Sequence, residues 1–186
     1  MEEIELYIEE AKEHMDKSVK HVSHELAKIR AGRAMPSMLD GLSIEYYGNP
    51  TPLNQVASVN SPDARTLVIK PWEKSLVGEI EKAIINSDLG LNPQNDGELV
   101  RLNIPPLTEE RRTNLVKQVK HEGENGKISV RNVRKDANDH LKKLLKEHVS
   151  EDEVKKAEQR IQELTDSYVQ KIDELVEKKE GEIMHV

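Results

Sequence analysis

Apolar residues in the first thirty positions recur at spacings that alternate between three and four. This repeat is typical of one face of an amphipathic helix. The apolar positions are Ile4, Ile8, Ala11, Met15, Val19, Val22, Leu26 and Ile29. At about 1.5 Å per residue the helix would be roughly 40 Å long. We expect it to end near Ala31 and Gly32, because glycine often follows the last turn of a helix.

The last forty residues carry the same repeat. Ser150 and Glu153 have the spacing of a capping box, in which both side chains satisfy free backbone amides at a helix start. The apolar positions that follow are Val154, Ala157, Ile161, Leu164, Tyr168, Ile172 and Leu175. The pattern predicts a second long helix.

A third helix is predicted after Pro105 and Pro106, with Thr108 as its N-cap. Its apolar positions are Leu115, Val119, Val130, Val133, Ala137, Leu141 and Leu144. Gly123 and Gly126 interrupt it, and each costs about 1 kcal/mol relative to alanine in a helix. Because the spacing continues through both glycines, we expect one continuous helix that can bend there. Three long stripes with short joins predict a three-helix bundle.

Residues 31–105 differ in kind. Short runs with β character lie at 42–47, 56–59, 66–70 and 98–104, and turn sequences such as Asn95-Asp96-Gly97 separate them. One short helix is expected around residues 73–86. All eight prolines lie between Pro36 and Pro106. The fold class is therefore α+β, with a bundle formed by residues 1–30 and 106–186 and an inserted small β/α/β domain at residues 31–105.

Two stretches of chain connect these domains. They consist of Arg30, Ala31, Gly32 and Arg33 on one side and Ile104, Pro105 and Pro106 on the other. A double connection allows bending and restrains larger excursions, so these residues form a predicted hinge.

The composition argues against several classes of function. The sequence has no cysteine, which excludes disulfides and thiolate chemistry. The acidic, amphipathic N-terminus does not resemble a targeting peptide, and no apolar run is long enough to span a bilayer, so we expect a cytoplasmic protein. His14, His21 and His24 share a helix without a surrounding ligand cluster. No phosphate-binding loop or nucleophile turn appears, so we expect no catalytic site, metal, cofactor or small-molecule substrate.

Charge is distributed unevenly in a chain whose net charge is -7. Residues 111–146 hold 11 Lys and Arg against 4 Asp and Glu, a net charge of +7. Residues 147–186 hold 6 against 12, and residues 1–30 hold 5 against 8. One basic helix beside acidic neighbours indicates a polyanionic partner.

A helical wheel centred on Arg131 places further residues within about 60° of it. They are Lys117, Lys120, Lys127, Lys135, Asn138, Lys142 and Lys146. This row of cations would be about 45 Å long. Glu124 is the only acid on it, which weakens the alternative of an ordinary solvated face. Arg134 lies between this row and the apolar seam, so a contact with the polyanion and an ion pair with the acidic last helix both remain open.

The kind of polyanion follows from the aromatic residues. Proteins that bind single-stranded nucleic acid stack bases on aromatic side chains. This chain has no phenylalanine and no aromatic residue between Trp72 and Tyr168. A row of Arg and Lys instead fits phosphates on structured RNA, where the planar guanidinium of Arg131 and Arg134 matches the ligand best.

The order of elements and three sequence strings resemble the ribosome recycling factor family. The strings are KIRAGRA at 28–34, PPLTEERR at 105–112 and VRNVRKDAND at 130–139. The resemblance covers essentially the whole chain. It implies an L-shaped fold with the outline of a transfer RNA, ribosomal-RNA contacts through Arg131 and Arg134 beside Lys135, and a hinge at the two connections.

The resemblance also implies a function. Members of the family bind the large ribosomal subunit across the transfer-RNA sites. With elongation factor G and GTP hydrolysis by that partner, they split the post-termination ribosome. We therefore expect a monomeric bacterial translation factor that is not an enzyme. The alternatives are a protein–protein adaptor with an exposed apolar seam, and a hydrolase with a polar cluster around Trp72 or Arg101.

Overall fold

The computed structural model describes residues 2–30 and 32–185, and the chain divides into two compact units. One unit joins the first helix to residues 109–185, and the other covers residues 32–108. The chain is α+β, with long helices in the first unit and a small mixed domain in the second.

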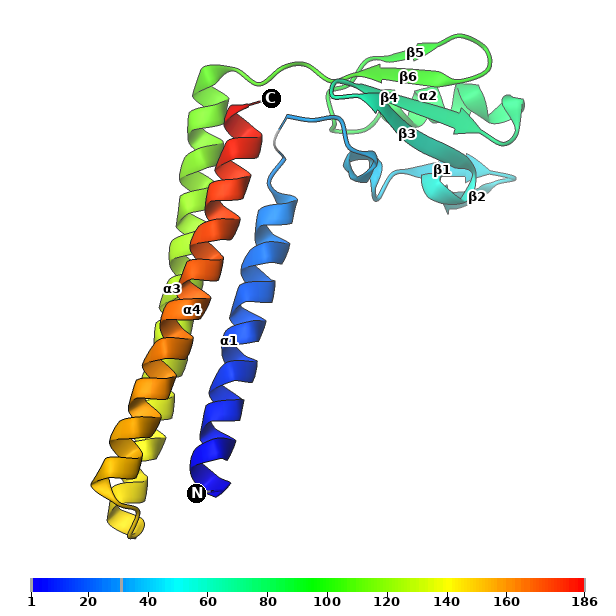
Figure 1. Cartoon of the computed structure of the whole chain (residues 1–186). Helices are drawn as coiled ribbons and strands as arrows, with labels where there is room; N and C mark the ends of the chain where they lie inside the picture. The colour runs from blue at the N-terminus through cyan, green and yellow to red at the C-terminus, as the bar shows by residue number, and fades with distance from the viewer. Residues whose placement is uncertain (1, 31, 186) are drawn as a thin grey trace. The chain divides into compact units, whose positions relative to one another are not determined.

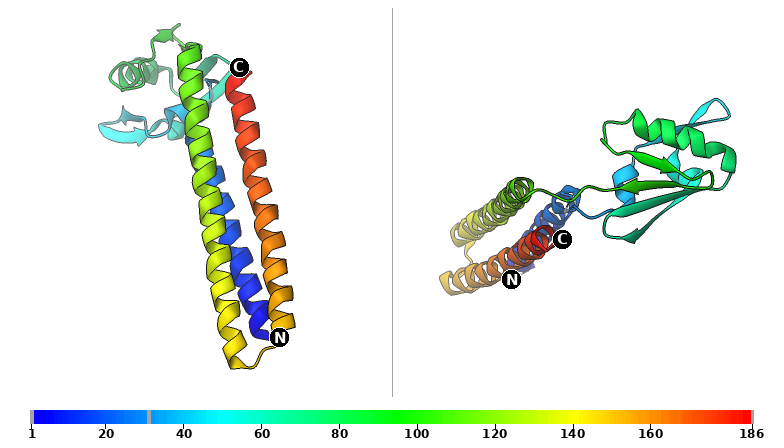
Figure 2. Two further views of the ribbon diagram at one scale, coloured as in Figure 1. Left: turned by 90° about the vertical axis from the view of Figure 1, so that its left-hand side faces the viewer. Right: turned by 90° about the horizontal axis from the view of Figure 1, so that it is seen from above.

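The first unit is a three-helix bundle. Helices α1 (Glu2–Lys28), α3 (Glu109–Leu144) and α4 (Glu151–Met184) run side by side (Figures 1 and 2). A 3-10 turn at Leu145–Glu147 leads from α3 to α4, and the α1 N-terminus lies at that end of the bundle. Helix α1 ends at Lys28, three residues before the expected position. A closing turn follows, in which the Ile29 amide donates to the Leu26 carbonyl at 3.1 Å.

The apolar seams predicted from the sequence face the interior of this bundle. Each predicted seam residue is buried or half-buried, including Val19, Val133, Leu164 and Leu175 at its margins. One cluster of buried residues lies toward the α3–α4 turn, and its members are Ile4, Ile8, Ala11, Ala137, Leu141, Leu144, Val154, Ala157 and Ile161. Helix packing therefore follows the three-to-four repeat of the sequence.

The capping box at the start of α4 is confirmed. The Glu153 amide donates to the Ser150 hydroxyl at 3.3 Å, and the Ser150 amide donates to the Glu153 carboxylate at 3.4 Å. Both bonds satisfy amides that have no carbonyl partner within the first turn. Three acidic residues occupy this turn, where negative charge is favourable to the helix dipole.

Helix α3 continues without interruption through Gly123 and Gly126, and both glycines are buried. A Cβ atom at Gly123 would overlap the Val176 side chain of α4. A Cβ atom at Gly126 would overlap the Val22 side chain of α1. At both glycines, side chains of a neighbouring helix therefore pack directly against the α3 backbone, and this packing offsets the low helix propensity of glycine.

The second unit contains a hairpin, a four-stranded sheet and a short helix (Figure 1). Strands β1 (Ser43–Tyr46) and β2 (Asn49–Pro52) form the hairpin. Strands β3 (Ala57–Asp63), β4 (Thr66–Pro71), β5 (Pro93–Asn95) and β6 (Val100–Asn103) form an antiparallel sheet in the order β3-β4-β6-β5. Helix α2 (Val77–Ile85) lies against β1, β5 and β6. It follows a 3-10 turn at Lys74–Leu76, and the two together occupy nearly all of the predicted residues 73–86.

The core of this unit draws on almost every element. Its buried residues are Ala34, Leu39, Ile44, Leu53, Val56, Ala57, Leu67, Ile69, Leu76, Val77, Ile80, Ile84, Leu91, Val100, Leu102 and Ile104. Burial alternates along β6, where Val100 and Leu102 are inside and their neighbours are exposed. This period of two is expected for a sheet with one covered face.

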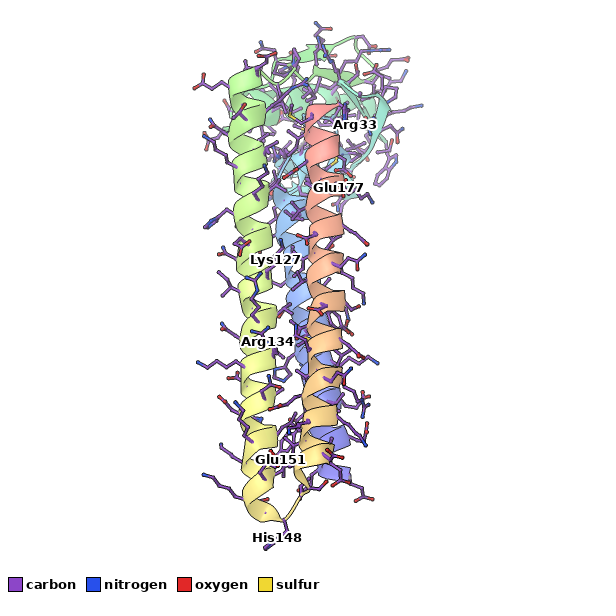
Figure 3. All side chains as sticks on the ribbon, turned by 60° about the vertical axis from the view of Figure 1, so that its left-hand side comes forward. Arg33, Lys127, Arg134, His148, Glu151 and Glu177 are labelled. Atoms are coloured by element: carbon purple, nitrogen blue, oxygen red, sulfur yellow. The ribbon has the colours of Figure 1, made fainter. Side chains whose placement is uncertain are left out.

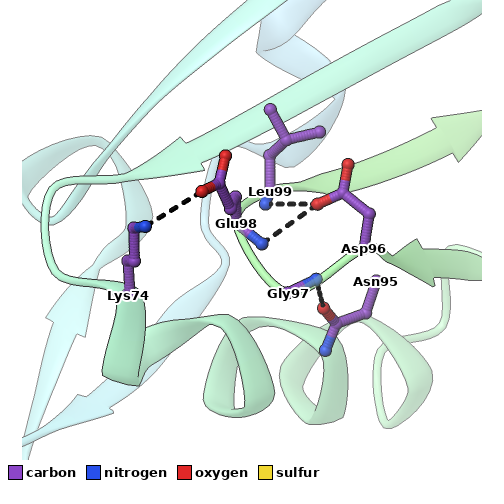
Figure 4. A network of polar contacts seen from close by, with 6 residues as sticks. All are labelled: Lys74, Asn95, Asp96, Gly97, Glu98 and Leu99. Carbon is purple, nitrogen blue, oxygen red and sulfur yellow. Dashed lines mark hydrogen bonds and ion pairs between the residues drawn. The ribbon is translucent and has the colours of Figure 1, made fainter.

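The predicted turn at Asn95-Asp96-Gly97 joins β5 to β6 (Figure 4). One Asp96 carboxylate oxygen accepts from the amides of Glu98 and Leu99 at 3.0 and 2.9 Å. These backbone hydrogen bonds lower the pKa of Asp96 below its usual value, since they favour the charged form. Gly97 has φ of +91°, a left-handed conformation that suits glycine. The ion pair between Lys74 and Glu98 at 2.9 Å ties the turn to the start of the helical segment.

Both connecting segments are anchored at one turn of the sheet. The Ala34 amide donates to the Ala64 carbonyl at 2.8 Å, and the Ile104 amide donates to the Arg65 carbonyl at 2.7 Å. The two segments also touch, because a Cβ atom at Gly32 would lie 2.6 Å from Leu107 Cγ. Gly32 has φ of +76°, so both its conformation and this contact require glycine.

No helix within residues 2–30 and 32–185 combines the length and apolarity required to cross a bilayer. In the same described residues no three His, Asp or Glu side chains are grouped so as to hold a metal ion.

Candidate RNA-binding surface

Helix α3 carries seven of the cations selected from the sequence. We call six of them the cation stripe, namely Lys117, Lys120, Lys127, Arg131, Lys135 and Lys142. Arg134 lies at its edge. Lys117, Lys120, Arg131, Lys135 and Lys142 are exposed, and Lys127 and Arg134 are half-buried. At about 1.5 Å per residue the stripe extends roughly 38 Å, shorter than expected because Lys146 falls in the 3-10 turn beyond α3.

The two half-buried cations lie on the side of α3 that faces α4 (Figure 3). Lys127 forms an ion pair with Asp173 of α4. The Arg134 guanidinium donates from Nη1 to Gln162 Oε1 at 3.4 Å, and the Gln162 amide donates to Asp166 Oδ1 at 2.9 Å. Arg134 therefore meets a neutral amide on the acidic helix, where an ion pair or an RNA contact had been expected. Its remaining guanidinium donors can still reach a ligand.

Arg131 also has a partner. Its Nη1 atom donates to Glu124 Oε1 at 3.3 Å. Asp139 lies four residues from both Lys135 and Lys143, but it makes no ion pair with any described residue. The exposed lysines of the stripe likewise have no carboxylate within 4.0 Å among the residues described.

An acidic residue of α1 forms an ion pair with a basic residue of α4. Both Nη atoms of Arg160 on α4 donate to the Glu5 carboxylate of α1, and the Nη2–Oε2 distance is 3.0 Å. This hydrogen-bonded pair lowers the pKa of Glu5 and raises the pKa of Arg160. Because the pair is exposed, it contributes little to stability. Arg160 therefore has a carboxylate partner on a neighbouring helix, whereas most cations of the stripe have no carboxylate partner among the described residues.

The stripe and the apolar seam divide α3 by face. Seam residues such as Val130, Ala137 and Leu141 pack inside the bundle, while Arg131 and Lys135 point outward, as the wheel predicted. The adaptor hypothesis required an exposed seam, but none of its positions is exposed. The outward face of α3 therefore offers charge, which suits phosphate oxygens.

Sequence reasoning missed the groups of α4 that reach this surface. Gln162 and Asp173 determine where Arg134 and Lys127 lie, yet each is more than 27 residues away along the chain. The available signal was only that the last helix is acidic. Which of its side chains face α3 depends on the relative rotation of two packed helices, and a single sequence does not give that rotation.

The sequence profile of the ribosome recycling factor family matches residues 22–184. The ribosome-recycling factor of Amoebophilus asiaticus is 58% identical over 186 residues, which is all of both chains. A solution structure of the ribosome recycling factor matches with a TM-score of 0.75 at 40% identity, covering all of both chains.

Another structure holds the T. thermophilus ribosome recycling factor and E. coli elongation factor G bound to the E. coli post-termination complex. A chain in it matches with a TM-score of 0.61 at 51% identity, over 97% of this chain and 98% of that one. These matches agree with the three sequence strings and with the bundle and small domain described above. The chain belongs to the ribosome recycling factor family.

Proposed function

We propose that this protein disassembles the post-termination ribosome. It binds the large subunit across the transfer-RNA sites and, with elongation factor G and GTP, separates the subunits. Its family membership and the relative that is bound, together with elongation factor G, to a post-termination complex support this role. Such a cycle takes place in the cytoplasm.

The exposed cation stripe of α3 is the observation that carries the proposal. Phosphates of ribosomal RNA dock along it, with Arg131 and Arg134 as planar donors and the exposed lysines as point charges. The stripe stands on one uninterrupted helix whose other face is buried, so its cations keep fixed spacings. A rigid row of this kind recognises the shape of folded RNA.

The protein acts mechanically in this proposal, and the GTPase activity belongs to its partner. The bundle stays docked while force reaches the small domain and passes through the two connections. Ile104 is buried in the core of the small domain, and its amide is hydrogen-bonded to the Arg65 carbonyl. In the connection to α3, motion therefore begins at Pro105. On the other side it involves Arg30, Gly32 and Arg33. Ala31, also assigned to the hinge, lies outside the described residues.

Co-sedimentation with purified large subunits across a salt series tests the docking role. Arg131→Ala with Arg134→Ala should weaken binding about tenfold to hundredfold, since two charge-assisted contacts are lost. The slope of log affinity against log salt should become shallower by about two. Lys12→Ala with Lys20→Ala on α1 removes the same charge away from the stripe and should change binding little. Unchanged binding by the arginine variant would refute the docking role.

A further inference from the structure

Arg131 and Glu124 form an ion pair along the face of α3 that carries the cation stripe. The two residues are seven apart, which corresponds to about 10.5 Å of helix rise. Both side chains must therefore extend along the same face to reach the 3.3 Å contact. Arg131 is 46% exposed and Glu124 is 56% exposed. An exposed pair of this kind contributes little to folding.

The pair lies where a ligand would bind. Glu124 is on the stripe, and its carboxylate takes one guanidinium donor of the residue on which the proposed docking chiefly depends. A phosphate arriving at Arg131 meets this carboxylate and must displace it or bind beside it. Since like charges repel, either arrangement is less favourable than binding to a free guanidinium.

The neighbouring section of the stripe has the same character. Lys127 is engaged by Asp173, and its side chain is only 21% exposed. The middle of the stripe thus holds two cations matched by two carboxylates. The sections on either side of it, at Lys117 and Lys120 and at Lys135 and Lys142, hold exposed lysines without ion-pair partners among the residues described. Attraction of RNA is therefore strongest at the ends of the stripe in the free protein.

We propose that Glu124 is a built-in competitor for Arg131, which limits how tightly and how long the stripe holds RNA. In the free protein Glu124 occupies the guanidinium. On docking a phosphate replaces it, and on release Glu124 takes Arg131 back. A factor that must leave after each round benefits from this exchange, because differences in affinity between related complexes lie mostly in the dissociation rate. This inference rests on the proposed function.

Glu124→Gln tests the competition directly. The amide keeps the size of the side chain and removes its charge. Affinity for large subunits at low salt should rise about fivefold, as expected for the loss of one close repulsion at the surface. The gain should appear mainly as slower dissociation in a kinetic measurement with immobilised subunits. Glu124→Asp keeps the charge, but its side chain is too short to span two turns, so it should also tighten binding, by about twofold.

Two controls separate a contact effect from a general change of charge. Glu163→Gln on α4 makes the same charge change beside Arg160, away from the stripe, and should alter affinity less than about twofold. In an Arg131→Ala background the gain from Glu124→Gln should disappear, since the competitor has lost its target. A double-mutant cycle measures that coupling.

The outcomes distinguish this inference from the function on which it rests. If Arg131→Ala with Arg134→Ala weakens binding but Glu124→Gln does not strengthen it, the competition is wrong and the docking role stands. Weaker binding by Glu124→Gln would mean that Glu124 positions Arg131 for RNA, which contradicts the proposal. A gain with Glu124→Gln together with wild-type binding by Glu124→Asp would assign the effect to the general field and overturn the ion-pair mechanism.

Discussion

The bundle and the small domain bury their apolar side chains in different ways. A helix of the bundle buries one stripe and leaves the rest of its surface available, so α3 carries a packed seam and the cation stripe over the same stretch of residues. The small domain closes its core from many short elements, and no strand contributes more than three buried side chains. A long surface row of fixed spacing is therefore easy to build on the bundle and difficult to build on the small domain.

The largest expected effects come from the centres of the two cores. Leu102 on β6 and Leu141 on α3 are both fully buried. Leu102→Ala should cost about 4 kcal/mol and Leu141→Ala about 3 kcal/mol. The difference arises because a helix can shift along its neighbours to reduce a cavity, whereas a central strand is held by hydrogen bonds on both sides. Amide hydrogen exchange reads each unit separately.

Val59→Ala is a suitable control, because this half-buried residue packs only at the margin of the sheet core. It should cost less than either leucine substitution. A larger loss from Leu141→Ala than from Leu102→Ala would show that the bundle is the more rigid core and would reverse the comparison.

The next effect concerns the close packing of neighbouring helices against the glycines of α3. Gly126→Val should destabilise the bundle by about 3 kcal/mol, because the new side chain would overlap Val22 in a filled interior. Gly181→Ala on α4 is the matched control, since a Cβ atom there has no heavy atom within 4 Å. That change should stabilise by about 0.5–1 kcal/mol through helix propensity. Urea unfolding followed by circular dichroism measures both.

If Gly126→Val were neutral, the helices would have room to separate at this point. The glycines would then only weaken the helix, as their low helix propensity indicates, and the contact with Val22 would not contribute to the stability of α3.

The bundle could be predicted closely because its information is local. The spacing of Ile4, Ile8 and Ala11 specifies a buried face whatever the partner helix is, and the capping box specifies where α4 begins. The glycines were predicted to lie inside a continuous helix, but the reason for them was not visible. It depends on Val22 and Val176, which belong to other helices.

The small domain was predicted less completely because its pairing is not local. Strands β2 and β5 were missed, since β2 contains two prolines and β5 begins with one. Proline cannot donate to a ladder and is tolerated at edges, so such strands exist only because a neighbour pairs with them. The candidate site shows the same limit. Its cations were found by periodicity, whereas their partners Gln162 and Asp173 depend on how α3 and α4 pack.

The smallest effect tests a polar contact inside the bundle. Tyr168 of α4 is buried, and its hydroxyl interacts with the Asp16 carboxylate of α1. Burial, and then this carboxylate, raise the pKa of Tyr168 to about 12. Tyr168→Phe should lower the free energy of unfolding by about 1 kcal/mol at pH 8, because the polar contact is lost. The loss is no larger because water can hydrate the half-buried Asp16 once the hydroxyl is gone. Urea unfolding at fixed pH measures this loss.

The pH dependence of that contact gives a sharper test. A folded-state pKa raised above the ordinary value of about 10 means that the neutral phenol is favoured in the folded protein. The stabilisation is complete below pH 10 and is lost as the pH rises through 12, by about 2–3 kcal/mol in total. The stability curves of the wild type and Tyr168→Phe should therefore cross between these pH values. Tyr47→Phe, at an 81% exposed position, should follow the wild-type curve. Parallel curves for the wild type and Tyr168→Phe would show that folding does not raise the pKa of Tyr168.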